Sequence, residues 1–342
     1  MAPQLGSPLF TAVALTGAAD LGWWKGQWTS AFADAAEARR WANENGHDAL
    51  AAYALALSMR FLAARGDHRR FAQAVQLCGG TPRFASVPVG HSRAATAGLL
   101  ALGTGNLDTA ISSLNRAGNL AEQAFHLGNP NVFFWAGDLV ESLSRLRRHA
   151  ADDAAVNVVL EMLDQCAETT GLGYPRMAAE RAHGIRASGL AEALEHFARA
   201  KDAVPGGGVM LFEYGRVLLA EGESLRRHRK PCAARHSLAE AVNVFDGLSA
   251  RPWSARAVSE LAAAGGSTVV GRTEAQVDDV LTPQEIQVVR RAGRGMSNTE
   301  IALTLYMSQK TVEAHLTRTY RKLGVRSRTQ LANVLFDQGL LE

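Results

Sequence analysis

A short pattern of apolar residues recurs along the first 260 residues and constrains the fold more than any other feature. Positions four and seven apart lie on one face of an α-helix, so an Ala-x3-Leu/Phe-x2-Ala run predicts a helix that packs closely through small residues. The first interval between runs is 83 residues and the second is 41, about half of it. The three runs are Ala110, Leu114 and Ala117; Ala193, Phe197 and Ala200; and Ala234, Leu238 and Ala241.

Helix-breaking residues precede these runs at Gly105-Asn106, Gly189 and Lys230-Pro231, and Gly66-Asp67 is an earlier breaker. A helix, a turn and a second helix therefore repeat, and such pairs stack into a solenoid because one pair cannot bury its own face. The region resembles tetratricopeptide repeats, although their consensus unit is shorter, about 34 residues. Residues 151–170 fit the pattern poorly, and a helical bundle without repeats is the alternative.

Composition favours an all-α fold, because the chain is rich in Ala and Leu and has few β-branched runs. With 47% hydrophobic and 20% charged residues, the 342-residue chain can bury a core. It has no apolar run long enough to span a membrane, and no basic residue precedes its mildly apolar start, as a secretory signal requires. The three cysteines form no CxxC motif. We therefore predict a cytoplasmic protein with no membrane partner.

The net charge of +3 conceals an asymmetry along the chain. Residues 281–342 carry nine Lys/Arg and five Asp/Glu, which leaves 27 and 28 for the first 280 residues. The positive excess therefore lies entirely in the last fifth of the chain and predicts an anionic partner there.

A change in composition separates two domains. Residues 262–279 read AAAGGSTVVGRTEAQVDD, and small and polar residues without periodicity indicate a linker. We predict a helical repeat domain over residues 1–262 for sensing or interaction, a linker over 263–280 and a second domain over 281–342.

Capping residues place four helix starts in the second domain. Thr282-Pro283-Gln284-Glu285 and Ser297-Asn298-Thr299-Glu300 have the form of capping boxes, Ser327 to Gln330 repeats it, and Ser308 caps the remaining helix. Gly293 and Gly295 close the first helix and Gly324 the third. The second helix buries Ile301, Ala302 and Leu305, and Tyr306 and Met307 form the turn that follows.

The third helix of this domain, over residues 309–323, has two different faces. Val312, Leu316, Tyr320 and Leu323 form one apolar stripe. The opposite face carries cations with small residues between them, and such a face can approach base edges while its cations neutralise phosphates. Its residues are Lys310, Ala314, Thr317, Arg318 and Arg321, with Thr311 and Lys322 at one margin and Glu313 at the other.

Residues 281–335 resemble the LuxR-type helix-turn-helix domain of bacterial transcription regulators. The resemblance includes LTPQE, the G-x-S-N-x-E-I-A core, the S-x-K-T-V-E-x-H-L helix and the R-K-L-G-V-x-S-R end. It implies base-edge contacts from Glu313, Ala314 and Thr317. It also implies phosphate contacts from Lys310, Thr311, His315, Arg318, Arg321 and Lys322.

Several of these residues have a second interpretation. Glu313 could instead form an ion pair along its helix with Lys310, and His315 could pack against the second helix. Arg326 and Arg328 could contact the DNA backbone or only be solvated. The family implies a dimer face on the last helix at Leu331, Val334 and Leu335, and the alternative is that these residues close the domain's own core.

Residues 223–266 also resemble the segment that precedes the DNA-binding domain in large ATP-binding LuxR-type regulators similar to the maltose-operon activator. Those regulators carry a P-loop, whereas no GxxxxGK[ST] motif occurs in this sequence. The ten histidines lack HxxxH and HExxH spacing, and no G-x-S-x-G motif occurs. We therefore expect no enzyme activity, no metal site and no cofactor.

Four tryptophans lie within nineteen residues, at Trp23, Trp24, Trp28 and Trp41. Trp24 falls near one helical face with Trp28 and with Trp41, so the cluster could line an effector groove. The alternative is that the rings fill the core at the end of the solenoid.

Together these features predict a homodimeric DNA-binding transcriptional regulator that reads double-stranded promoter DNA in the major groove, and that acts as a pathway-specific activator. RNA polymerase is a further candidate partner, and the helical repeat region would bind an effector, a partner or its own copy. The alternative function is a protein-interaction scaffold with an auxiliary DNA-binding domain.

Overall fold

The computed structural model describes residues 8–79, 87–125, 134–146, 150–203, 210–266, 281–323, 325 and 327–337. Within these ranges every regular element is an α-helix, so the all-α prediction is confirmed. No helix among the described residues combines the length and the apolar character that crossing a membrane would require.

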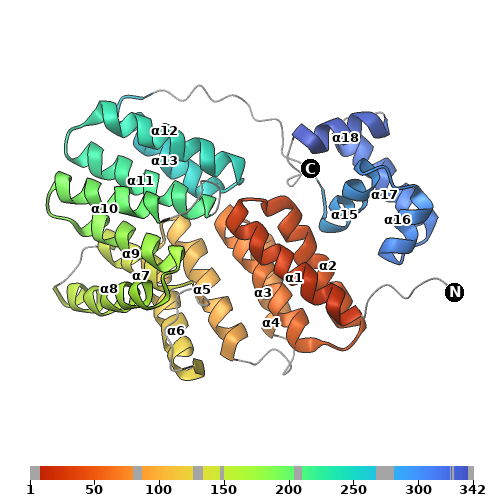
Figure 1. Cartoon of the computed structure of the whole chain (residues 1–342), viewed down its shortest axis with the longest axis horizontal. Coiled ribbons are helices and arrows are strands. Elements are labelled where there is room, and N and C mark those ends of the chain that lie inside the picture. The colour runs from red at the N-terminus through yellow and green to blue at the C-terminus, as the bar shows by residue number, and fades with distance from the viewer. Residues whose placement is uncertain are drawn as a thin grey trace. The chain divides into compact units, whose positions relative to one another are not determined.

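The helices before the predicted linker fall into an N-terminal group and a longer group of hairpins (Figure 1). The first group is α1 (Pro8–Lys25), α2 (Trp28–Glu44), α3 (Asp48–Arg65) and α4 (His68–Gly79). The second group is α5 (Val87–Gly103), α6 (Leu107–Phe125), α7 (Ala136–Leu146), α8 (Ala150–Thr170), α9 (Gly173–Arg186), α10 (Leu190–Asp202), α11 (Leu211–Arg227), α12 (Pro231–Gly247) and α13 (Arg251–Ala263). The C-terminal helices are α15 (Pro283–Gly293), α16 (Asn298–Leu305), α17 (Gln309–Leu323) and α18 (Arg328–Asp337).

The chain divides into two compact units. The terminal unit combines residues 1–23 and 27–58 with residues 270–342, and the central unit comprises residues 24–26 and 59–269. The first helices of the chain thus share a unit with the C-terminal helices. The predicted domain limits at 262 and 280 stay a prediction, and residues 267–280 of the linker lie outside the described residues.

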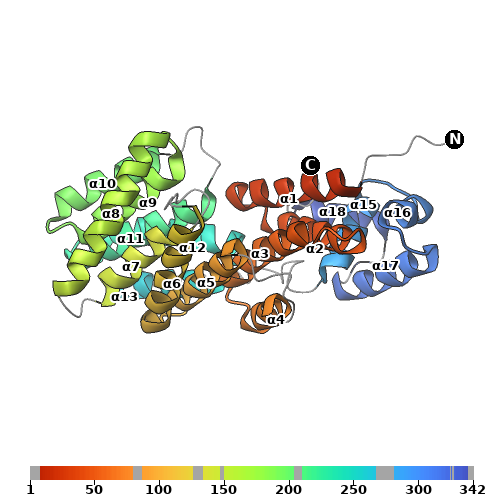
Figure 2. The same ribbon diagram turned by 90° about the horizontal axis from the view of Figure 1, so that it is seen from below.

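The central unit is built from helical hairpins that follow one another along the chain, as Figures 1 and 2 show for α9 to α12. All four predicted breakers lie at turns between helices. Gly66 and Gly105 have φ of +71° and +81°, Gly189 directly precedes α10, and Pro231 is the first residue of α12. Glycine at a positive φ avoids the steric cost that a side chain would impose, which explains why helices end at Gly66 and Gly105.

The recurring apolar runs lie on the second helix of their hairpins. All nine of their residues are at most 1% exposed: Ala110, Leu114, Ala117, Ala193, Phe197, Ala200, Ala234, Leu238 and Ala241. The large central residue of each run faces a glycine of the first helix. A Cβ added at Gly98, Gly184 or Gly222 would come within 2.6 Å of Leu114, Phe197 or Leu238 respectively. The three hairpins therefore share one packing arrangement.

An additional hairpin, α7–α8, occupies the interval of 83 residues between the first two runs. Its second helix buries Val156, Leu160 and Leu163 at the same spacing of four and seven. The spacing is kept while the alanines are replaced by larger residues, which is why residues 151–170 fitted the pattern poorly.

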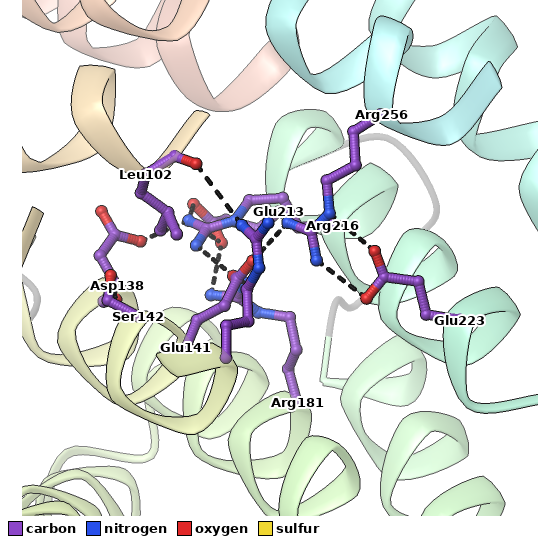
Figure 3. A network of polar contacts seen from close by, with 10 residues as sticks. Leu102, Asp138, Glu141, Ser142, Arg181, Glu213, Arg216, Glu223 and Arg256 are labelled. Atoms are coloured by element: carbon purple, nitrogen blue, oxygen red, sulfur yellow. Dashed lines mark hydrogen bonds and ion pairs between the residues drawn. The ribbon is translucent and has the colours of Figure 1, made fainter. Parts of the chain in front are cut away.

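A buried network of charges connects the first helices of successive hairpins (Figure 3). Glu141 of α7 accepts hydrogen bonds from Arg181 of α9 at 2.5 Å, Arg216 of α11 at 2.7 Å and Arg256 of α13 at 2.9 Å. Arg216 also pairs with Asp138 at 2.6 Å. Buried ions are tolerated only when they are paired in this way.

Two of the four clustered tryptophans lie in the core. Trp23 and Trp28 are buried and stack with ring centroids 4.6 Å apart, as the core interpretation predicts. The prediction that Trp24 and Trp28 share a helical face is wrong, because α1 ends at Lys25 and α2 begins at Trp28. Gly26, with φ of +73°, makes the turn between them.

Candidate nucleic-acid interface

Side-chain caps begin α15 and α16 as the sequence predicts. The Thr282 and Ser297 hydroxyls accept from the backbone N–H of Glu285 and Glu300, and both carboxylates accept from the capping residue's N–H. Such reciprocal bonds satisfy donors that a helix start otherwise leaves free. Each helix therefore begins at a defined residue.

The turn between α16 and α17 is tight. Tyr306 takes a left-handed conformation with φ of +52°, and the Met307 N–H donates to Ala302 O at 2.9 Å. The Ser308 hydroxyl then accepts from the Thr311 N–H at 3.1 Å and begins α17. The predicted turn and the predicted range of α17 are both confirmed.

One apolar core joins the four C-terminal helices. It includes Ile286, Ile301, Leu305, Val312 and Leu316. Leu331 and Leu335 of α18 are also fully buried in it, so they close the domain's own core. The side chain of Val334 lies outside the described residues, and so does Gly324.

The core fixes which face of α17 remains free. Eight of the nine predicted contact residues are exposed: Lys310, Thr311, Glu313, Ala314, Thr317, Arg318, Arg321 and Lys322. The apolar stripe on the other side is inside, with Val312 buried and Tyr320 partly buried. The helix therefore presents its cationic face to solvent.

The ninth residue, His315, is placed differently. It is only 9% exposed, and its Nδ1 atom has no hydrogen-bond partner. Burial and the cations of Arg318 and Lys322 lower its pKa, so the imidazole is neutral near pH 7. This position agrees with the packing interpretation, and a phosphate contact from His315 has no support in this arrangement.

Local contacts position several polar side chains of α17. Lys322 Nζ donates to Glu285 Oε2 at 2.6 Å. Burial disfavours the charged form of Glu285, but the hydrogen bonds from Lys322 and Thr282 outweigh this and lower its pKa. Glu313 accepts from Gln309 at 3.1 Å and has no ion pair with Lys310 among the described contacts. Glu285 therefore remains ionised near neutral pH.

Arg328 has a structural role that neither sequence interpretation included. Its Nε donates to Ala292 O at 3.0 Å, and its Nη2 donates to Met296 O. It thereby ties the start of α18 to the end of α15. Arg326 lies outside the described residues.

The structure also adds contacts from α2 that no sequence pattern predicts. Asp34 pairs with Arg290 at 2.9 Å, and Glu37 pairs with Arg291 at 3.2 Å. Ala33 belongs to the same apolar core as α15 to α18. The partners are separated by more than 250 positions, so no local pattern could reveal them.

A capped short helix, a tight turn and a second helix with an exposed cationic face define a helix-turn-helix. Residues 279–335 match the family model described as bacterial regulatory proteins, luxR family. This part of the chain is a LuxR-family helix-turn-helix domain. The LuxR-type domain accounts for the four C-terminal helices, and the match does not extend to the helical hairpins.

Relatives are similar to this chain within the LuxR-type domain. A putative HTH-type transcriptional regulator of Mycobacterium tuberculosis is 48% identical over 59 residues, which are 17% of this chain and 7% of that protein. The nitrate/nitrite response regulator protein homolog of Haemophilus influenzae is 40% identical over 60 residues, 18% of this chain and 29% of that protein. The transcriptional regulatory protein ComA of Bacillus subtilis is 38% identical over 63 residues, also 18% and 29%. The similarity thus spans less than a third of each relative. No solved structure matches the chain.

Proposed function

We propose that this chain is a DNA-binding transcriptional regulator that reads double-stranded DNA in the major groove through α17. The observation that carries the proposal is the exposed cationic face of α17 on a LuxR-type domain whose apolar face is buried. The relatives' names describe transcriptional regulators, which supports the same role. The hydrolytic or redox chemistry of an enzyme has no part in this function.

Base edges and phosphates would be contacted by different residues. Glu313, Ala314 and Thr317 would face base edges, with the Glu313 carboxylate able to accept from a cytosine amino group. Lys310, Arg318, Arg321 and Lys322 would neutralise phosphates, with Thr311 as a further hydrogen-bond donor. Phosphate neutralisation makes affinity fall steeply with salt, because bound counterions are released.

We assign the homodimer contact to α1 rather than to α18, whose leucines are buried in the domain core. The outer face of α1 is apolar and exposed, with Phe10 at 72%, Val13 at 48% and Leu21 at 60%. Between Pro8 and Ala19 the helix has no charged residue. A contiguous apolar face of this kind marks an interaction site.

The sequence of this face is self-complementary. Large residues lie at its ends and small residues at its middle, in the order Phe10, Val13, Ala14, Gly17, Ala18 and Leu21. In an antiparallel twofold pair, Phe10 of one copy would lie opposite Leu21 of the other and Ala14 opposite Gly17. A Cβ at Gly17 would meet nothing within 4 Å, so this position is open to a second copy. Twofold contacts require such reciprocity.

Sedimentation velocity of the full chain tests the dimer. Ala14→Arg places a charge at the centre of the face, and we expect it to convert the dimer to a monomer. Ala239→Arg, at an exposed alanine of α12, is the matched control and should leave the dimer intact. A monomeric wild-type chain, or a dimeric Ala14→Arg variant, would exclude this contact.

Selection of bound genomic fragments, followed by sequencing, tests the function. We expect a twofold-symmetric motif that is enriched by the wild type and lost in the Lys310→Ala/Arg321→Ala double variant. If the retained fragments share no motif, and the double variant retains the same fragments as the wild type, the scaffold function would be favoured instead. Run-off transcription with RNA polymerase on a selected promoter then tests activation, for which we expect more transcript on adding the protein.

A further inference from the structure

A groove of about 760 Å³ lies inside the terminal unit, where α2 meets the LuxR-type domain. Cavities that bind small molecules have volumes of roughly 300–1,000 Å³, so its size suits a metabolite. α2 contributes one wall, and α15, α17 and the turn before α17 contribute the other. Its lining residues include Ala33, Ala36, Arg39, Arg40, Pro283, Leu305, Met307, His315, Arg318 and Lys322.

The carboxylates of the groove are already paired. Glu37 pairs with Arg291 at 3.2 Å, Glu44 with Arg40 at 3.1 Å, and Glu285 with Lys322 at 2.6 Å. No acid among the lining residues is therefore left to bind a cation.

The basic side chains, in contrast, keep unused donors. Arg40 Nη2 is buried without a partner, although Nη1 of the same guanidinium is bonded to Glu44. Arg39 makes no hydrogen bond or ion pair to any residue that the structure describes, and Arg318 uses only Nε, toward Ala314 O. Guanidinium groups with free N–H donors bind carboxylate and phosphate oxygens.

A buried polar side chain of a different kind lines the same groove. The nine-tenths buried His315 has no partner for Nδ1, and a buried polar atom normally finds one. A ligand hydroxyl, amide or carboxyl group in the groove would supply it.

Apolar side chains occupy the space between these groups. Ala33, Ala36, Pro283, Leu305 and Met307 line the groove together with the aliphatic stems of the cations. An inorganic anion would leave this surface without contacts, whereas an organic body would cover it.

We propose that this groove binds a small organic anion, a carboxylate or phosphate monoester on an apolar or aromatic body. Arg39, Arg40 and Arg318 would hold the anionic group, and His315 would bond a second polar group. The regulatory consequence rests on the proposed function: Arg318 and Lys322 are also predicted phosphate contacts, so ligand and DNA would compete and the ligand would release DNA.

Fluorine NMR of the full chain tests the site, with 4-(trifluoromethyl)benzoate and 4-(trifluoromethyl)phenyl phosphate as probes. We expect line broadening for at least one anion and about tenfold weaker binding of the neutral 4-(trifluoromethyl)benzamide, because a charged hydrogen bond is lost. Arg39→Ala/Arg40→Ala should weaken the anion about tenfold for the same reason, while Arg176→Ala, an exposed arginine of α9, should not.

A second variant tests the groove without changing its charge. Ala36→Trp would fill the groove from α2 while leaving the sequence of α17 unchanged, and it should abolish broadening of the probe. The proposal would be overturned if both variants bound the anion as tightly as the wild type, or if the wild type bound the amide as tightly as the anion. The absence of line broadening with both anions would also overturn it.

Duplex DNA added to the probe distinguishes the ligand from the DNA backbone. We expect DNA to displace the anion, and Arg39→Ala/Arg40→Ala to bind DNA with unchanged affinity. If that variant instead loses DNA affinity and no small anion binds, the groove is part of a phosphate track and the small-molecule site is excluded. Probe binding by a chain that fails to bind DNA would contradict the proposed function alone.

Discussion

Arginines serve opposite purposes in the central unit and on the LuxR-type domain. Arg181 and Arg216 have side chains 1% and 2% exposed, and each pairs with Glu141. Arg318 and Arg321 of α17 are exposed, and neither pairs with a carboxylate in the described part of the chain. The same side chain thus fixes how helices pack where its charge is buried, and remains available for a partner where its charge is solvated.

The difference follows from the cost of removing a charge from water. A buried guanidinium must be neutralised by neighbouring acids, so its position depends on several helices at once. An exposed guanidinium carries no such cost and little stabilising energy. Substitutions should therefore affect stability in the first region and DNA affinity in the second.

The largest effect is expected for Glu141→Ala, which leaves three arginines without their shared carboxylate. We expect the free energy of unfolding to fall by about 3–5 kcal/mol, as for other broken buried ion pairs. Burial opposes ionisation of Glu141, but Arg216, Arg181 and Arg256 hold its pKa well below the usual range. This stabilisation is therefore present above the unfolded pKa and is lost as the pH falls.

Urea unfolding followed by circular dichroism measures this effect at neutral and acidic pH. Glu122→Ala, at an exposed position of α6, is the matched control and should change stability by less than about 0.5 kcal/mol. A loss below about 1 kcal/mol for Glu141→Ala would mean that water reaches the network, since solvated pairs contribute that little.

The converse is expected for Lys310→Ala/Arg321→Ala. Stability should stay within about 0.5 kcal/mol of the wild type, because both side chains are exposed. The slope of log affinity against log salt should become shallower by about 3.6, since each phosphate contact contributes about 0.9 and the double variant removes two contacts from each copy of the proposed dimer. Fluorescence anisotropy with a selected duplex across a salt series measures it, with Arg176→Ala as the control. An unchanged slope would place the DNA contacts elsewhere.

A smaller effect is expected for Thr282→Ala, which removes the cap of α15 while leaving every charge in place. Loss of such a cap costs about 1 kcal/mol. Hydrogen exchange should accelerate in the first turn of α15 and leave the hairpins of the central unit unchanged. Equal acceleration in α11 would show that the units do not open independently.

The smallest effect concerns His315. Its lowered pKa means that below about pH 6.5 the unfolded chain takes up a proton that the folded chain resists, so stability decreases as the pH falls. His315→Gln should remove this contribution to the pH dependence between pH 7 and 5. Thermal unfolding of both proteins across that range measures it, and parallel curves would mean that His315 is solvated.

The local signals in the sequence predicted the LuxR-type domain well. Some features depend only on residues within four positions of one another, so they can be predicted without a tertiary structure. These are the capping boxes at Thr282 and Ser297 and the turn at Tyr306. The same holds for the stripe that starts at Val312 and for the breaker at Gly105. The α7–α8 hairpin fits the repeat pattern poorly because its buried run has Val156 and Leu163 where the other runs have alanine.

The sequence by itself therefore determined the all-helical fold, the helix ends at the capping boxes and repeat breakers, and the cationic face of α17. Tertiary structure alone decided the buried network around Glu141, the contact of α2 with α15 and the burial of His315. These features join residues far apart in the chain, as Arg290 and Asp34 show. Which charges meet depends on how hairpins stack, and no local periodicity records that.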